Sequence, residues 1–285
     1  MSSPEVAAPI SRAGSGTRPL LGNELATQFG RWRTWAMLTA LALIPVLLGV
    51  AVRLVGGSRP GRGPAFLDQI TDNGLFVAFA ALTVAVPLFL PLTVSVVAGD
   101  AIAGEAGHGT LRYLLTAPAG RVRLLLVKYL AAAAFCVAAT LTVVVVGALV
   151  GSILFPLGPV TLLSGAQVSF GEGLLRLLPV AAYASVSLFG LAAIGLFLST
   201  LTTVPVGAMA ATAILAVAAQ IVGAIPQLDA VHPWLFTDMW LDFGDLLRSP
   251  IVWDSFARNA LLQGGYILVF GAAAIARFTT KDVLS

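Results

Sequence analysis

Residues 124–155 read LLLVKYLAAAAFCVAATLTVVVVGALVGSILF, an apolar run in which Lys128 is the sole charged side chain. A helix needs about 20 such residues to cross a bilayer, and this run is longer. Five further apolar runs accompany it, and each is expected to be helical because the bilayer interior offers no water to unpaired backbone groups. The six predicted spans are residues 34–55, 74–98, 124–155, 174–198, 204–225 and 258–276.

The composition also indicates a membrane protein. The 285 residues are 58% hydrophobic and 10% charged, with a mean hydropathy of +0.96. Soluble domains carry about 25% charged residues, so a soluble enzyme of ordinary composition is excluded. The apolar runs are continuous rather than alternating, which argues against a transmembrane β-barrel. The predicted fold class is therefore an all-α membrane protein with six transmembrane helices.

Arginine and lysine are unequally divided between the two sides of the predicted topology. Six of them lie on the side that holds the loop after the first span. The other side, with the N-terminal tail, residues 99–123 and the C-terminal tail, holds Arg12, Arg18, Arg31, Arg33, Arg112, Arg121, Arg123, Lys128, Arg277 and Lys281. Cytoplasmic segments carry the excess of such residues, so we expect a multi-pass protein of the cell membrane with both termini in the cytoplasm.

The N-terminal segment divides into two parts. Residues 1–19 are rich in Ser, Pro, Gly and Ala, and we expect them to form a disordered tail before a six-span permease domain over residues 20–285. Residues 20–35 place apolar side chains at helical spacing, which predicts an amphipathic helix on the inner membrane surface, with its arginines on anionic lipid. The polar and interfacial residues of this predicted helix are Glu24, Arg31, Trp32 and Arg33. The alternative is that the helix is a simple membrane anchor.

The most informative loop is GDAIAGEAGHGTLRYLLTAPAGRVR, residues 99–123, which mixes acids and bases with short helical stretches broken by Gly and Pro. Together with the entry helix and six spans, it resembles the permease subunits of ABC-2 type transporters. In that family the second span leads into an acidic residue, a Gly-Thr pair, a Leu-rich turn, Pro, a basic pair and a Lys that opens the third span. The matching positions are Asp100, Glu105, Gly109, Thr110, Leu111, Leu114, Leu115, Pro118, Arg121 and Lys128.

The resemblance implies that this loop is a coupling helix, as in type V exporters, seated on a cytoplasmic ABC ATPase subunit. It implies two ATPase copies, which bind the ATP and Mg, and a second permease copy or a sibling permease beside the lipid bilayer. A solvated charge cluster is the alternative interpretation of the loop. The residues expected to couple to the ATPase are Asp100, Glu105, Gly109, Thr110, Arg112, Pro118, Arg121 and Lys128.

Motifs for catalysis are missing from the sequence. Neither Lys128 nor Lys281 follows a Gly-rich phosphate-binding loop, so we expect no ATP hydrolysis by this chain. His108 and His232 fall on opposite sides of the predicted membrane, and Cys136 is the single cysteine, so no metal site is expected. We expect no cofactor in this chain and no nucleic-acid partner.

The polar groups within the spans are mild. Hydroxyl groups in membrane helices more often bond a neighbouring helix or their own backbone than a substrate. A pathway lined by Ala, Val, Leu and Phe suits a hydrophobic or amphipathic substrate, such as a drug, antibiotic, lipid or peptide. The candidates for the substrate pathway are Thr93, Ser95, Thr140, Thr142, Ser187 and Gln220.

These patterns lead to one functional hypothesis and one alternative. The hypothesis is the permease subunit of an ATP-driven ABC exporter, which performs efflux by alternating access powered by a separate ATPase. The alternative is a membrane scaffold or assembly subunit that transports nothing.

Two further patterns concern packing. Gly147-x-x-x-Gly151 predicts close helix contact, as do Gly190, Gly195, Gly207 and Gly271. Between the last two spans, residues 234–247 place apolar side chains on one arc and three aspartates on the opposite arc, which predicts a helix in the outer interface.

Overall fold

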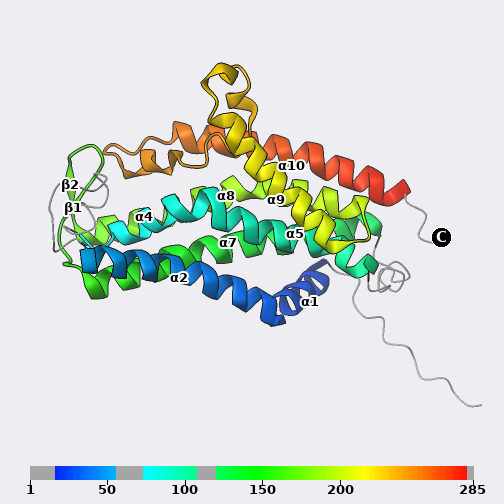
Figure 1. Ribbon diagram of the computed structural model, residues 1–285, viewed down its shortest axis with the longest axis horizontal. Coiled ribbons are helices and arrows are strands. Elements are labelled where there is room, and N and C mark those ends of the chain that lie inside the picture. Colours follow the sequence, from blue (N-terminus) through cyan, green and yellow to red (C-terminus); the bar gives the residue numbers. More distant parts are fainter. Residues whose placement is uncertain (1–16, 56–72, 108–119, 281–285) are drawn as a thin grey trace, which may run out of the picture.

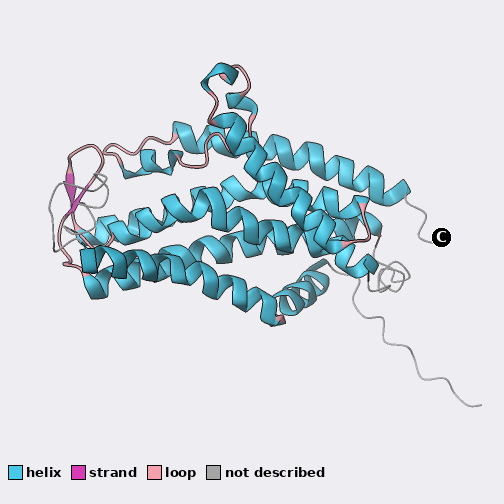
Figure 2. Cartoon of the chain, viewed as in Figure 1, coloured by secondary structure: helices cyan, strands magenta, loops and turns pink. Residues whose placement is uncertain are grey.

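A computed structural model describes residues 17–55, 73–107 and 120–280. Almost all of the described chain is helical (Figure 2). Along the chain the elements are α1 (Thr17–Gly30), α2 (Trp32–Val55), α4 (Phe76–Val84), the π-helix η1 (Ala85–Phe89), α5 (Leu90–Gly107), α7 (Arg121–Leu154), strands β1 (Val160–Thr161) and β2 (Gln167–Val168), α8 (Phe170–Leu201), α9 (Pro205–Gly223), the 3₁₀ helices η2 (Pro226–Leu228), η3 (His232–Trp234) and η4 (Asp242–Leu247), and α10 (Asp254–Thr280).

The predicted all-α membrane fold is confirmed. In the described ranges, six helical segments are long and apolar enough to cross a membrane, and α4, η1 and α5 together form one of them. The spans run along the long axis of the molecule, with the β1–β2 hairpin at one end and with α1 and the end of α10 towards the other, on opposite sides of the bundle (Figure 1). We call these the hairpin end and the α1 end. The predicted cytoplasmic segments adjoin the α1 end, and the side of the membrane that this end faces stays a prediction.

Two predicted boundaries are wrong in an informative way. The second span was expected to end at residue 98, but its helix continues to Gly107, so Asp100 and Glu105 lie on helix α5 rather than in a loop. The entry helix was expected to run from residue 20 to residue 35, but the chain bends at Arg31 and α2 begins at Trp32. The predicted disordered tail lies, apart from its last three residues, outside the described residues; those three begin α1.

Helix α8 lies at the centre of the bundle. In the most apolar 18-residue stretch of α8, 78% of the residues are buried inside the protein, compared with 17% for α10 and 22% for α9. The helix begins where Ser169 accepts a hydrogen bond from the backbone N–H of Glu172 at 3.3 Å, the usual role of a serine at a helix N-cap. The outer faces of α9 and α10 are therefore left for lipid or for another subunit.

Glycines bring α4 and α7 into backbone contact. A Cβ atom at Gly151 would overlap the backbone of Gly74, and one at Gly147 would lie 2.6 Å from the Cα atom of Ala78. Close packing of the Gly147–Gly151 pair is thus confirmed, because these positions have no room for a side chain.

The other glycines predicted to pack closely behave differently from one another. A Cβ at Gly190 or Gly195 would meet side chains of neighbouring helices, as expected. At Gly207 and Gly271 no atom of the described structure lies within 4 Å of an added Cβ, so within this chain the prediction is wrong for those two.

The second span contains a π-helical turn next to two prolines. Pro91 has no N–H group, so the carbonyl of Pro87, four residues earlier, loses its normal helical partner. Gln220 of α9 supplies the missing donor, with its Nε2 atom 2.6 Å from the Pro87 oxygen. This side chain therefore stabilises an irregular backbone that would otherwise leave a polar group unpaired among apolar helices.

The predicted outer helix is wrong in shape but right in its buried face. Residues 224–253 form turns and short 3₁₀ helices instead of one continuous helix. The apolar arc is nevertheless buried, because Phe236, Trp240 and Phe243 pack into the core. Pro233 and Gly244 fall in this segment, and both residue types disfavour a continuous α-helix.

Candidate functional site

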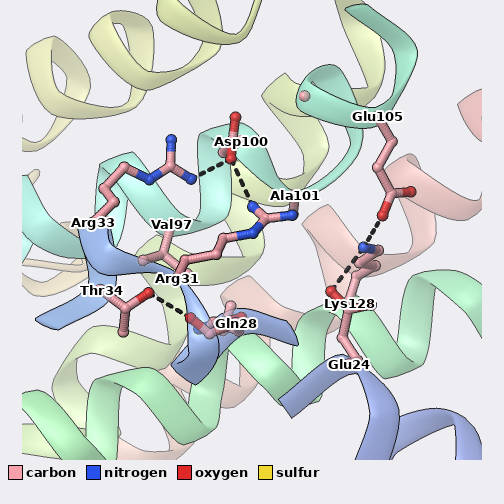
Figure 3. A pocket seen from close by; sticks show the side chains of 12 residues that line it. Glu24, Gln28, Arg31, Arg33, Thr34, Val97, Asp100, Ala101, Glu105 and Lys128 are labelled. Atoms are coloured by element: carbon pink, nitrogen blue, oxygen red, sulfur yellow. Dashed lines mark hydrogen bonds and ion pairs between the residues drawn. The ribbon is translucent and has the colours of Figure 1, made fainter. Parts of the chain in front are cut away.

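A buried ammonium group joins three helices at the α1 end. Lys128, about two turns inside α7, is 4% exposed, and its Nζ atom donates to Glu24 Oε1 at 2.7 Å and to Glu105 Oε1 (Figure 3). Glu24 belongs to α1 and Glu105 to the last turns of α5. The two carboxylates are 21% and 17% exposed, so all three charges are largely removed from water.

A second set of ion pairs lies beside the first. Arg31, at the bend between α1 and α2, lies 3.3 Å from Asp100 Oδ2, and Arg33 of α2 pairs with the same oxygen. Figure 3 shows the two guanidinium groups converging on this carboxylate from different directions. Asp100 is one turn before Glu105 on α5, so one helix receives both sets of pairs. We call the six charged residues of both sets the ionic junction.

The ionic junction surrounds a cavity of about 560 Å³. Its wall is completed by less polar residues of the same helices: Gln28, Thr34, Val97, Ala101, Gly104 and Ala132. The cavity therefore lies among α1, α2, α5 and α7, at the place where α5 leads into residues 108–119 and α7 leads out of them.

Helix α5 is also held from its other side, by Ser199 of α8. The Ser199 hydroxyl donates to the carbonyl of Gly99 at 2.7 Å and accepts from the backbone N–H groups of Ile102 and Ala103, at 3.0 and 2.8 Å. Ser199 is fully buried. A Cβ atom at Gly99 would lie 2.7 Å from the backbone of Met209 in α9, so α5 has no room to move separately from α8 and α9.

Buried ion pairs are costly, because each ion loses several kcal/mol of hydration that its partners must offset. A junction of this kind is therefore weak evidence for added stability. It fixes the relative positions of helices, since each charge is tolerated only while its partner is in place.

The comparisons with known proteins give one family and one relative. A family model described as "Protein of unknown function (DUF2705)" matches residues 50–284. The chain belongs to the DUF2705 family. Over 93 residues it is 37% identical to the "Probable ABC transporter permease protein NosY" of Pseudomonas aeruginosa. That match covers 33% of the DUF2705 protein and 31% of the relative, so the chain aligns with under a third of the relative's length.

The structure brings together residues from two separate predictions. Asp100, Glu105 and Lys128 belong to the set expected to couple to an ATPase, and Glu24 and Arg33 belong to the expected interfacial helix. The structure brings these side chains into contact with one another inside the DUF2705 chain. Whether the junction transmits motion from an ATPase stays a prediction. Trp32, the aromatic member of the interfacial set, is 83% exposed.

The remaining predicted coupling residues are placed as follows. Arg121, the first residue of α7, donates to the carbonyl groups of Phe278 and Thr279 at 3.3 and 3.0 Å, which satisfies the end of α10. It therefore ties α7 to α10 at the α1 end. Outside the described residues lie Gly109, Thr110, Arg112 and Pro118.

The residues proposed for a substrate pathway mostly bond their own helices. The hydroxyl groups of Thr93, Ser95, Thr140, Thr142 and Ser187 each donate to a carbonyl three or four residues earlier. Thr140 also lies 2.5 Å from Ser185 of α8, and Gln220 supports the π-helical turn. A role in substrate binding stays a prediction for all six.

Sequence reasoning missed two polar residues that join helices. Ser199 was visible in the turn after the fourth span, but no pattern in the sequence indicated that its hydroxyl reaches the α5 backbone. Asn259 is fully buried and donates to Ser187 at 2.7 Å, linking α10 to α8. An amide at the start of a predicted span is a signal that could have identified it.

Residues 224–253, between α9 and α10, carry a cluster of aspartates at and near η4. Partial desolvation of its carboxylate, and then repulsion from Asp245 and Asp238, raise the pKa of Asp242 above its ordinary value. A raised pKa in the folded state means that the protonated form favours folding. This contribution is fully present below the unfolded-state pKa and is lost as the pH rises through the folded-state value.

We therefore expect Asp242→Asn to stabilise the protein slightly at neutral pH, by up to about 0.5 kcal/mol because the site is on the surface. As the pH is lowered the gain should shrink, because a growing fraction of Asp242 is then protonated in the wild type. Thermal unfolding of both proteins at neutral and at lower pH measures the difference. A gain that grows on acidification would contradict the assigned direction of the pKa shift.

Proposed function

We propose that this protein is the permease subunit of an ATP-driven ABC transporter of the ABC-2 type. It exports a hydrophobic or amphipathic substrate by alternating access, and a separate cytoplasmic ATPase supplies the energy. The observation that carries the proposal is the ionic junction, which ties α1 and α2 to the two helices that flank residues 108–119. The similarity to a probable ABC transporter permease supports it over part of the chain.

The mechanism follows from how rigidly the helices are linked. An ATPase that pushes on residues 108–119 pushes on the end of α5 and the start of α7 together. Lys128 passes this displacement to Glu24 of α1, and Asp100 passes it to Arg31 and Arg33. Ser199 passes it to α8. The α1 end then moves as one body, which is the kind of motion that alternating access requires.

The inner part of this chain suits an apolar substrate. The buried uncharged polar groups of the described spans are hydroxyls and amides, which have hydrogen-bond partners apart from the Oε1 atom of Gln263. Lys128 and Arg176 are the buried cationic residues among those described. Lys128 is held by two carboxylates at the α1 end. Arg176 pairs with Glu172 near the hairpin end and donates to the carbonyl of Arg248 at 2.6 Å. Neither cation is therefore positioned to coordinate an ionic substrate midway across the bundle.

The proposed assembly contains two ATPase subunits, which bind ATP and Mg, and a second permease copy or sibling. One six-span chain would then supply half of the pathway. The exposed apolar faces of α9 and α10 leave surface for such a neighbour or for lipid.

The proposal is tested by capturing the full chain from native membranes in mild detergent and measuring ATP hydrolysis. We expect an ATPase subunit to copurify and hydrolyse ATP, and candidate apolar substrates to stimulate the turnover. A folded chain captured without any ATPase would contradict the proposal. Copurification without stimulation by any substrate would favour a scaffold subunit.

A further inference from the structure

The ionic junction holds three cations and three carboxylates, but these charges are unevenly paired. On the side nearest α2, Arg31 and Arg33 share the single carboxylate of Asp100, whereas Lys128 pairs with both Glu24 and Glu105. No other carboxylate of the described residues forms an ion pair with either guanidinium, although the charges of Glu105 and Arg31, which both line the cavity of about 560 Å³, attract each other. Each guanidinium therefore has fewer carboxylate contacts than the ammonium group of Lys128.

The two guanidinium groups are also open to a further ligand. Arg31 is 48% exposed and Arg33 is 41% exposed, in contrast to Lys128. A guanidinium carries five N–H donors, and in the described structure each of these two makes one hydrogen bond, to Asp100. Both side chains line the cavity (Figure 3), so donors remain for an anionic group that enters it.

The position of the cavity indicates which anion is available. Trp32 and Trp35 flank Arg33 in sequence and are 83% and 57% exposed. Indole side chains at the start of a span concentrate at the level of the lipid headgroups. The indole of Trp35 is held against its own chain, because its Nε1 atom donates to the carbonyl of Phe29 at 2.7 Å. We therefore expect Arg31 and Arg33, next to these indoles in the sequence, at the depth of the lipid phosphates.

From these observations we infer that the cavity beside Arg31 and Arg33 binds the phosphate of an anionic phospholipid headgroup. The phosphate accepts hydrogen bonds from the N–H groups of both guanidiniums that Asp100 leaves unused. Asp100 competes with it for the same two guanidinium groups. The inference goes beyond the transport function and does not depend on it, since the site is formed by this chain alone.

The test uses the full chain, purified in detergent without any ATPase, and measures bound phosphatidylglycerol by native mass spectrometry. The double variant Arg31→Gln/Arg33→Gln should bind this lipid about tenfold more weakly, because basic residues near the membrane surface each contribute to anionic-lipid binding. Arg53→Gln, at the other end of α2, is the matched control and should leave binding unchanged. Phosphatidylcholine should bind weakly to all of these proteins.

The Asp100→Asn variant distinguishes a lipid site from a purely structural role of Arg31 and Arg33. Removing the competing carboxylate should strengthen phosphatidylglycerol binding about tenfold, whereas general damage to the fold would weaken it. This variant keeps the test decisive if the double arginine variant fails to fold. Equal binding by the wild type and a folded double variant, or weaker binding by an Asp100→Asn variant that keeps the wild-type melting temperature, would overturn the inference. Displacement of the lipid by millimolar inorganic phosphate would assign the site to a soluble anion instead.

Discussion

Replacing Lys128 with methionine should destabilise the protein by about 3–5 kcal/mol, the range measured when one partner of a buried ion pair is removed. The side chain is 4% exposed, and its loss leaves Glu24 and Glu105 facing each other without a cation. Thermal unfolding of the purified chain in detergent measures the loss.

The matched control restores charge balance without restoring the lysine. Adding Glu24→Gln and Glu105→Gln to Lys128→Met removes the two carboxylate charges that have lost their cation. Most of the lost stability should return, because replacing all members of a buried ion cluster with uncharged residues often changes the free energy of unfolding little. If Lys128→Met alone cost under about 1 kcal/mol, as exposed pairs do, the junction would be solvated and its linking role wrong.

Gly151→Ala should be the most damaging single methyl addition in the bundle. The new Cβ would overlap the backbone of Gly74, which has no flexible atoms to give way, so α4 and α7 must separate. Overpacking of this kind costs about 1–3 kcal/mol and sometimes more. The melting temperature and the fraction of monodisperse protein after extraction both report it.

Gly265→Ala is the comparison for this prediction. No atom of the described structure lies within 4 Å of a Cβ built at Gly265 in α10, so alanine should be tolerated or should stabilise the helix by about 0.5–1 kcal/mol. Equal losses from Gly151→Ala and Gly265→Ala would show that contact between α4 and α7 is not the cause.

The spans could be predicted from the sequence because apolar length alone identifies them. The end of the second span could not, since hydropathy falls where Asp100 and Glu105 begin, while the helix continues to Gly107. Hydropathy reports burial in lipid, and these two carboxylates are instead buried by other parts of the chain. In the outer segment the pattern predicted the buried face correctly, but a periodic arc does not prove a continuous helix.

The members of the ionic junction were recognised individually, but their pairing was not. Glu24 and Lys128 are 104 residues apart, and Arg33 and Asp100 are 67 apart. A single sequence contains no signal that assigns one acid to one base across such distances. The same limit applies to Ser199, whose hydrogen bonds reach residues about 100 positions earlier.

The linking role of the junction is tested most directly by ATP turnover in the reconstituted complex of this chain with its ATPase. Glu105→Gln keeps the shape of the side chain but removes the charge that holds Lys128, a contact of the charge-assisted class, worth about 1.5–3 kcal/mol. Glu172→Gln removes an ion-paired carboxylate near the hairpin end and serves as the control. We expect Glu105→Gln to lower the permease-stimulated ATP turnover about tenfold or more, with the ATPase still bound, and Glu172→Gln to leave it unchanged. Wild-type turnover by Glu105→Gln would contradict the linking role of the ionic junction.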